Sequence, residues 1–204
     1  MDHSFTSSKT YRYFTLGNQV KATKLLIVMH GYGQLAQFFL QKFNTCADSY
    51  FIVAPEGPHR FYKEGYSGRV GASWMTKEAR EHDIQDNIKW LDALLTKFKM
   101  DKKFEDVILL GFSQGGATAS RWYYNEPTHF DQLILWSTVF PPDIDKSIIK
   151  EGHNNLYVVG TKDEFIHESK RKEEINFYKS IGFSISVYDG NHDIDKEVLK
   201  NLFQ

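Results

Sequence analysis

The chain is 204 residues long, and its 25 lysines and arginines nearly balance its 26 aspartates and glutamates, so the formal net charge is -1. This balance gives no strong field for a polyanion, which argues against nucleic acid as the main partner, and the single cysteine, Cys46, excludes an internal disulfide and a cysteine-based zinc cluster. A hydrophobic fraction of 41% and an aromatic fraction of 15% exclude a disordered chain and suffice for the core of a single α/β domain spanning residues 1–204.

Short apolar runs alternate along the chain with longer stretches of helical periodicity. The runs predict strands at 11–16, 23–29, 51–54, 107–110, 133–136, 156–159 and 183–188. Several of them are apolar on both faces, as strands buried from both sides must be. Helices are expected at 34–48, 77–99, 114–125, 166–181 and 193–203, with Asp193 capping the last one. This order predicts a mostly parallel sheet with helices on both faces.

The stretch 55–75 breaks this alternation. It contains four glycines and two prolines with several aromatic residues among them, which predicts a long loop. Loops of this length in compact domains are usually functional, so we expect it to border a pocket.

The most informative motif is Gly111-Phe112-Ser113-Gln114-Gly115, which matches G-x-S-x-G. It directly follows a predicted buried strand and directly precedes a predicted helix, which is the context of a nucleophile elbow. In such a turn a strained backbone exposes the serine hydroxyl, and the flanking glycines allow close backbone approach. The alternative is a tight strand-to-helix turn without catalysis. The combined context favours Ser113 as a nucleophile.

A serine nucleophile needs a base and a group that orients the base, and the expected chain order is Ser, acid, His. His192 follows the last predicted strand and precedes the last predicted helix, which is the position expected of the base. The other histidines after Ser113 lie in predicted helices or connecting loops: His129, His153 and His167. Asp163 follows the penultimate strand and is the preferred acid, and Glu164 beside it is the alternative.

Acyl transfer also needs hydrogen-bond donors for the negatively charged oxygen of the tetrahedral intermediate. One donor is expected to be the backbone N–H of Gln114, the residue after the nucleophile. The second is expected from the glycine-containing loop after the strand at 23–29, where Tyr32 N–H takes that position; an ordinary glycine turn is the alternative. Trp74 and Met75 are candidate substrate-binding residues in an apolar acyl pocket, with core packing as the alternative. Arg69 is a candidate for contact with a substrate carboxylate or phosphate, with an ordinary surface position as the alternative.

Six short motifs occur in a characteristic order: His30-Gly31-Tyr32-Gly33, Ala54-Pro55-Glu56-Gly57-Pro58, Ser73-Trp74, the elbow extended to Gly116, Gly160-Thr161-Lys162-Asp163 and Gly190-Asn191-His192. With them, residues 22–203 resemble the phospholipase/carboxylesterase family of α/β-hydrolases, which includes acyl-protein thioesterases. The resemblance implies an α/β-hydrolase fold with little or no cap domain. It also implies a Ser113, Asp163 and His192 triad, oxyanion donors at Tyr32 and Gln114, and no cofactor or metal.

The expected function is hydrolysis of small-molecule carboxylic esters or thioesters through an acyl-enzyme intermediate. A serine peptidase on the same fold is one alternative, because the same triad cleaves amides. A noncatalytic binding protein that kept the fold is another. The sequence does not indicate an oligomeric state.

The amino terminus has neither a basic region nor a long apolar region, and so does not resemble a secretory signal. The apolar stretch 25–29 is far shorter than the roughly 20 residues that span a bilayer. We therefore expect a cytoplasmic protein without stable membrane insertion.

Overall fold

The computed structural model describes residues 1, 3–125, 129–145, 147 and 154–203. Its central sheet has the strand order β1-β3-β2-β6-β7-β8-β9. The strands are β1 (Tyr13–Leu16), β2 (Lys24–Met29), β3 (Tyr50–Pro55), β6 (Asp106–Phe112), β7 (Gln132–Trp136), β8 (Leu156–Gly160) and β9 (Ser184–Tyr188). Only β1 pairs antiparallel, with β3; the other neighbours are parallel. The predicted mostly parallel sheet is confirmed.

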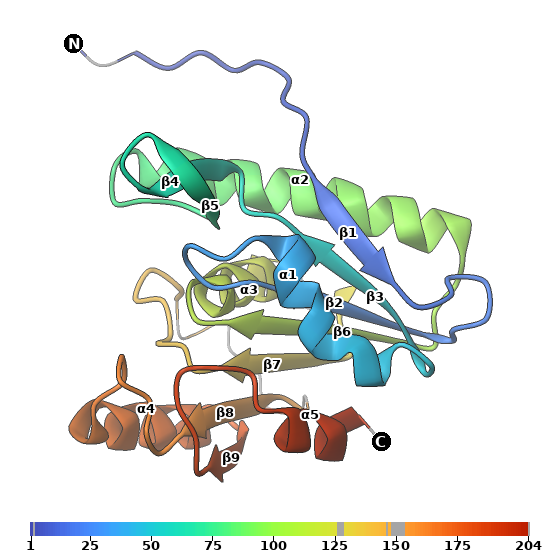
Figure 1. Ribbon diagram of the computed structural model, residues 1–204, viewed down its shortest axis with the longest axis vertical. Helices are drawn as coiled ribbons and strands as arrows, with labels where there is room; N and C mark the ends of the chain where they lie inside the picture. The colour runs from blue at the N-terminus through green and yellow to red at the C-terminus, as the bar shows by residue number, and fades with distance from the viewer. Residues whose placement is uncertain (2, 126–128, 146, 148–153, 204) are drawn as a thin grey trace.

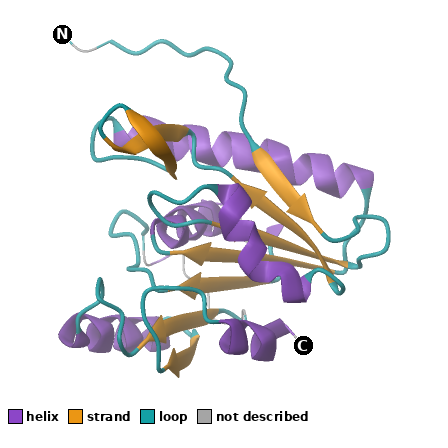
Figure 2. Cartoon of the chain, viewed as in Figure 1, coloured by secondary structure: helices purple, strands orange, loops and turns teal. Residues whose placement is uncertain are grey.

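Helices cover both faces of the sheet (Figures 1 and 2). They are α1 (Ala36–Leu40), the 3-10 helix η1 (Gln41–Cys46), α2 (Arg80–Asp101), α3 (Gln114–Asn125), α4 (Glu168–Ser180) and α5 (Lys196–Phe203). One core contains buried side chains of α2, α3 and α4, and the other contains side chains of α1, η1 and α5. Neighbouring residues of β2 alternate between the two cores, since successive side chains of a strand point to opposite faces. This explains why the inner parallel strands are apolar over most of their length.

The predicted long loop at 55–75 is wrong, because most of this stretch forms a hairpin outside the central sheet. Strand β4 (His59–Glu64) pairs antiparallel with β5 (Ser67–Ser73). The glycines that suggested a loop have specific places in it: Gly65 has a positive φ of 58° at the turn. Gly71 lies so close to the backbone of Gly33 that an added Cβ would be 2.7 Å from the Gly33 carbonyl oxygen. Glycine and charged residues therefore concealed a regular strand pair.

The predicted cap of the last helix is also wrong. Helix α5 begins at Lys196, and the carboxylate of Asp195 accepts the backbone N–H groups of Glu197 and Val198 at 3.0 and 2.9 Å. Asp193 instead forms an ion pair with Lys42 of η1 at 2.8 Å. The cap is two residues further along the chain, because residues 191–194 remain part of the preceding loop.

The topology brings the loops that carry the candidate site residues to one edge of the sheet. Strands β2, β6, β8 and β9 run in the same direction, so the segments that follow them meet at their carboxyl ends. The β4-β5 hairpin lies near the end of the sheet toward which the arrows of β6 and β7 point (Figure 1). Among the described residues, no helix is long and apolar enough to cross a membrane.

Candidate active site

Ser113 occupies the sharp turn between β6 and α3. Its φ of 53° is in the left-handed region, which is strained for a residue with a side chain. Two hydrogen bonds hold the turn: the Ser113 N–H donates to the Trp136 carbonyl at 3.0 Å, and the Ser113 carbonyl accepts the Gly116 N–H at 2.9 Å. A Cβ on Gly115 would lie 2.4 Å from the Met29 carbonyl oxygen, so only glycine fits there. The strained turn expected of a nucleophile elbow is therefore present.

His192 and Asp163 form a close pair. The Nδ1 atom of His192 lies 2.8 Å from Oδ2 of Asp163, whose side chain has no exposed surface. The other carboxylate oxygen accepts the backbone N–H groups of Phe165 and Ile166 at 2.9 and 3.2 Å. Burial by itself raises the pKa of Asp163, but the hydrogen bond and positive charge of His192, with the backbone N–H of Phe165, outweigh it and hold that pKa below its ordinary value. Asp163 is therefore ionised at neutral pH and holds the proton of His192 on Nδ1.

Glu164, the alternative acid, contacts a different part of the same histidine. Its carboxylate accepts the backbone N–H of His192 at 3.2 Å. That hydrogen bond ties the loop of His192 to the loop after β8, without orienting the imidazole ring. The geometry thus distinguishes the two acidic neighbours.

The imidazole of His192 lies between two aromatic rings. The ring centroids of Phe112 and Phe165 are 4.9 and 4.7 Å from that of His192. Ser113 and His192 line one cavity of about 270 Å³, together with apolar side chains that include Val139 and Ile166. The two side chains are therefore on the same side of the sheet, as an attacking serine and its base must be.

The loop at residues 30–33 lies directly against the nucleophile. A Cβ added to Gly31 would be 3.2 Å from Cβ of Ser113, which shows how closely the backbone approaches. The Gly33 N–H donates to Ala72 at 2.9 Å, and the Gly31 N–H donates to the side chain of Gln34 at 2.9 Å. Tyr32 N–H, by contrast, has no acceptor among the described residues. Gln114 is the first residue of α3, where backbone N–H groups lack intrahelical acceptors.

The side chain of His30 holds the loop at residues 30–33 in place through two hydrogen bonds. It is fully buried, and burial lowers its pKa to about 4, so the ring is neutral at pH 7. Its Nε2 accepts the backbone N–H of Gly57 at 2.9 Å, which requires the ring proton on Nδ1, where it is donated to the Gly31 carbonyl at 2.8 Å. In the sequence His30 stands out only as part of a motif, because its partner Gly57 is 27 positions away.

The side chain of Gln114 joins α3 to the end of the hairpin. Its Oε1 accepts the backbone N–H of Trp74 at 3.1 Å, and its Nε2 donates to the Met75 carbonyl at 2.8 Å. The hydroxyl of Ser73 lies within hydrogen-bond distance of both amide atoms. Gln114 therefore has a structural role through its side chain, separate from the role expected of its backbone N–H.

We expect Gln114→Ala to lower the free energy of unfolding by about 1–3 kcal/mol, because the N–H of Trp74 and the carbonyl of Met75 lose their partners in a partly buried site. Urea unfolding at constant pH measures this change. Gln114→Glu is the matched control. It keeps an acceptor for the N–H of Trp74 but offers the Met75 carbonyl no donor, so we expect it to lower the free energy of unfolding as well. Wild-type stability of the alanine variant would contradict the structural role.

The prediction that Trp74 binds substrate is wrong for this structure. Trp74 has no exposed surface; its indole N–H donates to the His30 carbonyl at 2.8 Å, and its ring stacks on Trp90 of α2 at 6.3 Å. It is part of the core that supports the 30–33 loop, which was the alternative interpretation. Met75 is half-buried, and its contact with substrate stays a prediction.

A tyrosine that the sequence analysis did not single out organises the loop of His192. The Tyr188 hydroxyl lies 2.6 Å from the Asp193 carbonyl and 3.0 Å from the Asn191 carbonyl, on both sides of His192. It accepts the indole N–H of Trp136 at 3.2 Å. Its position at the end of the last strand was the only available signal.

Of the other histidines after Ser113, His129 and His167 do not line this cavity, and His153 lies outside the described residues. No group of three histidine, cysteine, aspartate or glutamate side chains in the described part of the chain could hold a metal ion. The polar groups at the carboxyl edge are those of acid-base and nucleophilic chemistry.

The fold is similar to the crystal structure of esterase PE8, with a TM-score of 0.74 and 19% identity over 96% of this chain and 97% of that one. It is also similar to a carboxylesterase from Mesorhizobium loti, with a TM-score of 0.74 and 16% identity over 95% of this chain and 93% of that one.

Among curated proteins, a probable 1-acylglycerol-3-phosphate O-acyltransferase from Oryza sativa subsp. japonica is 26% identical over 110 residues, which are 54% of this chain. The matched region is 24% of that relative, so the similarity covers about a quarter of its length. The phospholipase/carboxylesterase family model, in contrast, matches residues 14–204, nearly the whole chain. The chain therefore belongs to the phospholipase/carboxylesterase family.

Proposed function

We propose that the protein hydrolyses carboxylic esters or thioesters through an acyl-enzyme intermediate on Ser113. The observation that carries this proposal is the shared cavity of Ser113 and His192: the serine is in a left-handed turn, and the histidine is paired with buried Asp163. A base that is oriented by a buried carboxylate and shares a cavity with a serine is the arrangement that activates the serine hydroxyl.

In the first half of the reaction, Oγ of Ser113 bonds to the substrate carbonyl carbon while Nε2 of His192 takes its proton. The proton on Nδ1 stays hydrogen-bonded to Asp163, whose negative charge stabilises the imidazolium. The carbonyl oxygen becomes negatively charged and accepts the backbone N–H groups of Tyr32 and Gln114. The intermediate then expels the alcohol or thiol, which leaves with the proton from His192.

In the second half, water attacks the acyl group on Ser113 and gives a proton to His192. The same two N–H groups stabilise the second oxyanion. Its collapse releases the carboxylic acid, and His192 returns a proton to Ser113. The net reaction is ester plus water to acid plus alcohol, which needs no cofactor.

A fluorophosphonate probe tests this function directly, because it reacts with serines that are activated for acyl transfer. We expect one equivalent of probe to bind, to modify Ser113, and to abolish hydrolysis of p-nitrophenyl butyrate in proportion to labelling. Peptide mapping by mass spectrometry distinguishes Ser113 from Ser137, which lines the same cavity and serves as an internal control. Modification of Ser137 instead, or full activity after stoichiometric labelling, would rule out the proposed nucleophile.

A further inference from the structure

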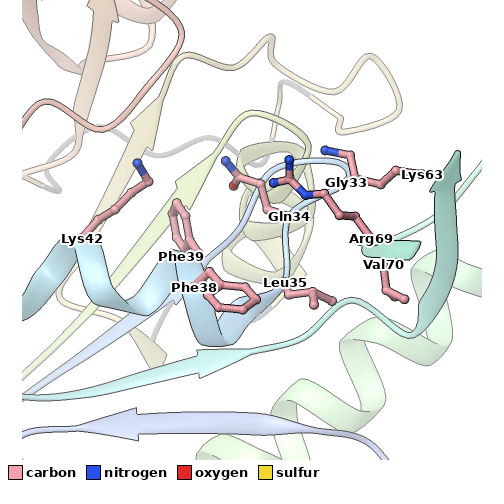
Figure 3. A pocket seen from close by; sticks show the side chains of 9 residues that line it. All are labelled: Gly33, Gln34, Leu35, Phe38, Phe39, Lys42, Lys63, Arg69 and Val70. Atoms are coloured by element: carbon pink, nitrogen blue, oxygen red, sulfur yellow. The ribbon is translucent and has the colours of Figure 1, made fainter. Parts of the chain in front are cut away.

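A second and larger cavity, of about 540 Å³, lies between the 30–33 loop, helix α1 and the β4-β5 hairpin. Its wall is apolar on one side, where Leu35, Phe38 and Phe39 contribute their side chains. Lysine and arginine side chains from three different segments line the rest: Lys42, Lys63 and Arg69. Figure 3 shows Arg69 and Lys63 reaching from the hairpin toward Gln34, with the aromatic rings on the α1 side.

An irregularity in the hairpin brings two of these cations together. Between the pairs Tyr62–Val70 and Glu64–Ser67, the register shifts by one residue, so Gly68 and Arg69 of β5 oppose the single residue Lys63 of β4. Gly68 has a positive φ of 85°, a conformation that suits glycine at such a bulge. Bulges next to active sites redirect side chains. Here Lys63 and Arg69 lie across from each other and line one cavity.

Within the part of the chain that the structure describes, these two cations have no counter-charge. Lys42 is paired with Asp193, but neither Lys63 nor Arg69 pairs with a carboxylate of the described residues. Like charges directly opposite on an antiparallel pair are unfavourable. The net charge of the chain is -1, so this local concentration of positive charge is not part of a general basic surface. A negatively charged ligand would remove the repulsion and gain charge-assisted hydrogen bonds, in which the planar guanidinium of Arg69 contacts two oxygens at once.

The cavity is adjacent to the reaction centre. Gln34, which lines it, accepts the N–H of Gly31, and a Cβ added to Gly31 would lie 3.2 Å from Cβ of Ser113. The aliphatic end of Lys63 is 3.5 Å from the position of a Cβ on Gly33, beside the expected oxyanion donor. On the other wall, the ring of Phe39 is 5.9 Å from that of Phe112, which contacts His192.

We propose that this cavity binds the anionic group of the substrate, so that the protein prefers esters that carry a carboxylate or a phosphate some bonds away from the scissile carbonyl. Lys63 and Arg69 hold the anion, and the wall formed by Leu35, Phe38 and Phe39 holds the adjoining carbon chain. The inference rests on the proposed ester hydrolysis at Ser113 and adds the class of substrate.

The test compares kcat/KM within two matched pairs of esters. One pair is p-nitrophenyl hydrogen glutarate and p-nitrophenyl pentanoate, which have five-carbon acyl groups ending in a carboxylate or a methyl group. The other is 1-butyrylglycerol-3-phosphate and 1-butyrylglycerol, which differ by a phosphate on the alcohol side. We expect kcat/KM of the wild type to be about tenfold higher for the anionic member of at least one pair, because two exposed ion pairs contribute a free energy of about this size. The preferred pair shows whether a carboxylate or a phosphate is bound.

The combined substitution Lys63→Met and Arg69→Met should remove this preference, so that kcat/KM becomes similar for the anionic and the neutral member of each pair. The matched control is Lys21→Met with Lys103→Met, which removes two exposed positive charges just before β2 and β6, at the opposite edge of the sheet. We expect the control to keep the preference, and added salt to weaken it in the wild type because both cations are exposed.

Equal kcat/KM within both pairs, or a preference that survives in the double variant, would overturn the assignment of an anion site. If the neutral esters are still hydrolysed and Ser113 is still labelled in that case, the proposed hydrolase function stands. If none of the four esters is hydrolysed and Ser113 is not labelled, the hydrolase function fails, and the substrate class fails with it.

Discussion

Replacing Ser113 with alanine should lower kcat/KM for p-nitrophenyl butyrate by at least about four orders of magnitude, because the variant has no nucleophile to form the acyl-enzyme. The residual rate should reflect only water attack assisted by the backbone donors at Tyr32 and Gln114. Steady-state hydrolysis after removal of any contaminating esterase, with loss of fluorophosphonate labelling as a second readout, measures this change.

The left-handed backbone of Ser113 supplies a control for this prediction. A residue with a Cβ is disfavoured at a φ of 53°, whereas glycine adopts it freely. Ser113→Gly should therefore be as inactive as Ser113→Ala but at least as stable in urea unfolding. Such a result separates loss of chemistry from loss of fold. An alanine variant that is folded and turns over at the wild-type rate would show that another group is the nucleophile.

The sequence predicted the parts of the fold that depend on local patterns. The seven apolar runs correspond to the seven strands of the central sheet, with ends shifted by one or two residues. Helix α3 begins and ends as expected at 114 and 125, since the elbow before it fixes its start. Local hydrophobic periodicity decides such elements, so one sequence suffices to locate them.

The features that depend on distant partners were not predictable in the same way. Trp74 was expected to bind substrate but is buried beneath His30, because its burial follows from the packing of α2. The hairpin at 59–73 was missed because its glycines and charged residues hide the alternation of a strand pair. Tyr188 and His30 act through hydrogen bonds to backbone atoms of other loops, and no short motif marks such contacts.

The candidate site illustrates both situations. Ser113 and His192 could be singled out because each has a distinctive place at the end of a strand, and the structure brings them to one cavity. The sequence favoured Asp163 over Glu164 only because aspartate suits a turn after a strand, and the two residues occupy adjacent positions. In the structure the choice follows from side-chain direction: the Asp163 carboxylate points to the imidazole of His192, and the Glu164 carboxylate points to the backbone N–H of His192.

That difference in direction makes Asp163→Asn and Glu164→Gln a discriminating pair, since each removes one negative charge from a neighbouring position. Asp163→Asn should lower kcat by about four orders of magnitude, because the amide no longer fixes the proton of His192 on Nδ1 or stabilises the imidazolium. Glu164→Gln should lower it far less, because the amide oxygen still accepts the His192 N–H. The measurement is kcat for p-nitrophenyl butyrate from pH 5 to 9. A large loss in the glutamine variant with a small loss in the asparagine variant would make Glu164 the acid and would show that the buried hydrogen bond of Asp163 only supports the fold.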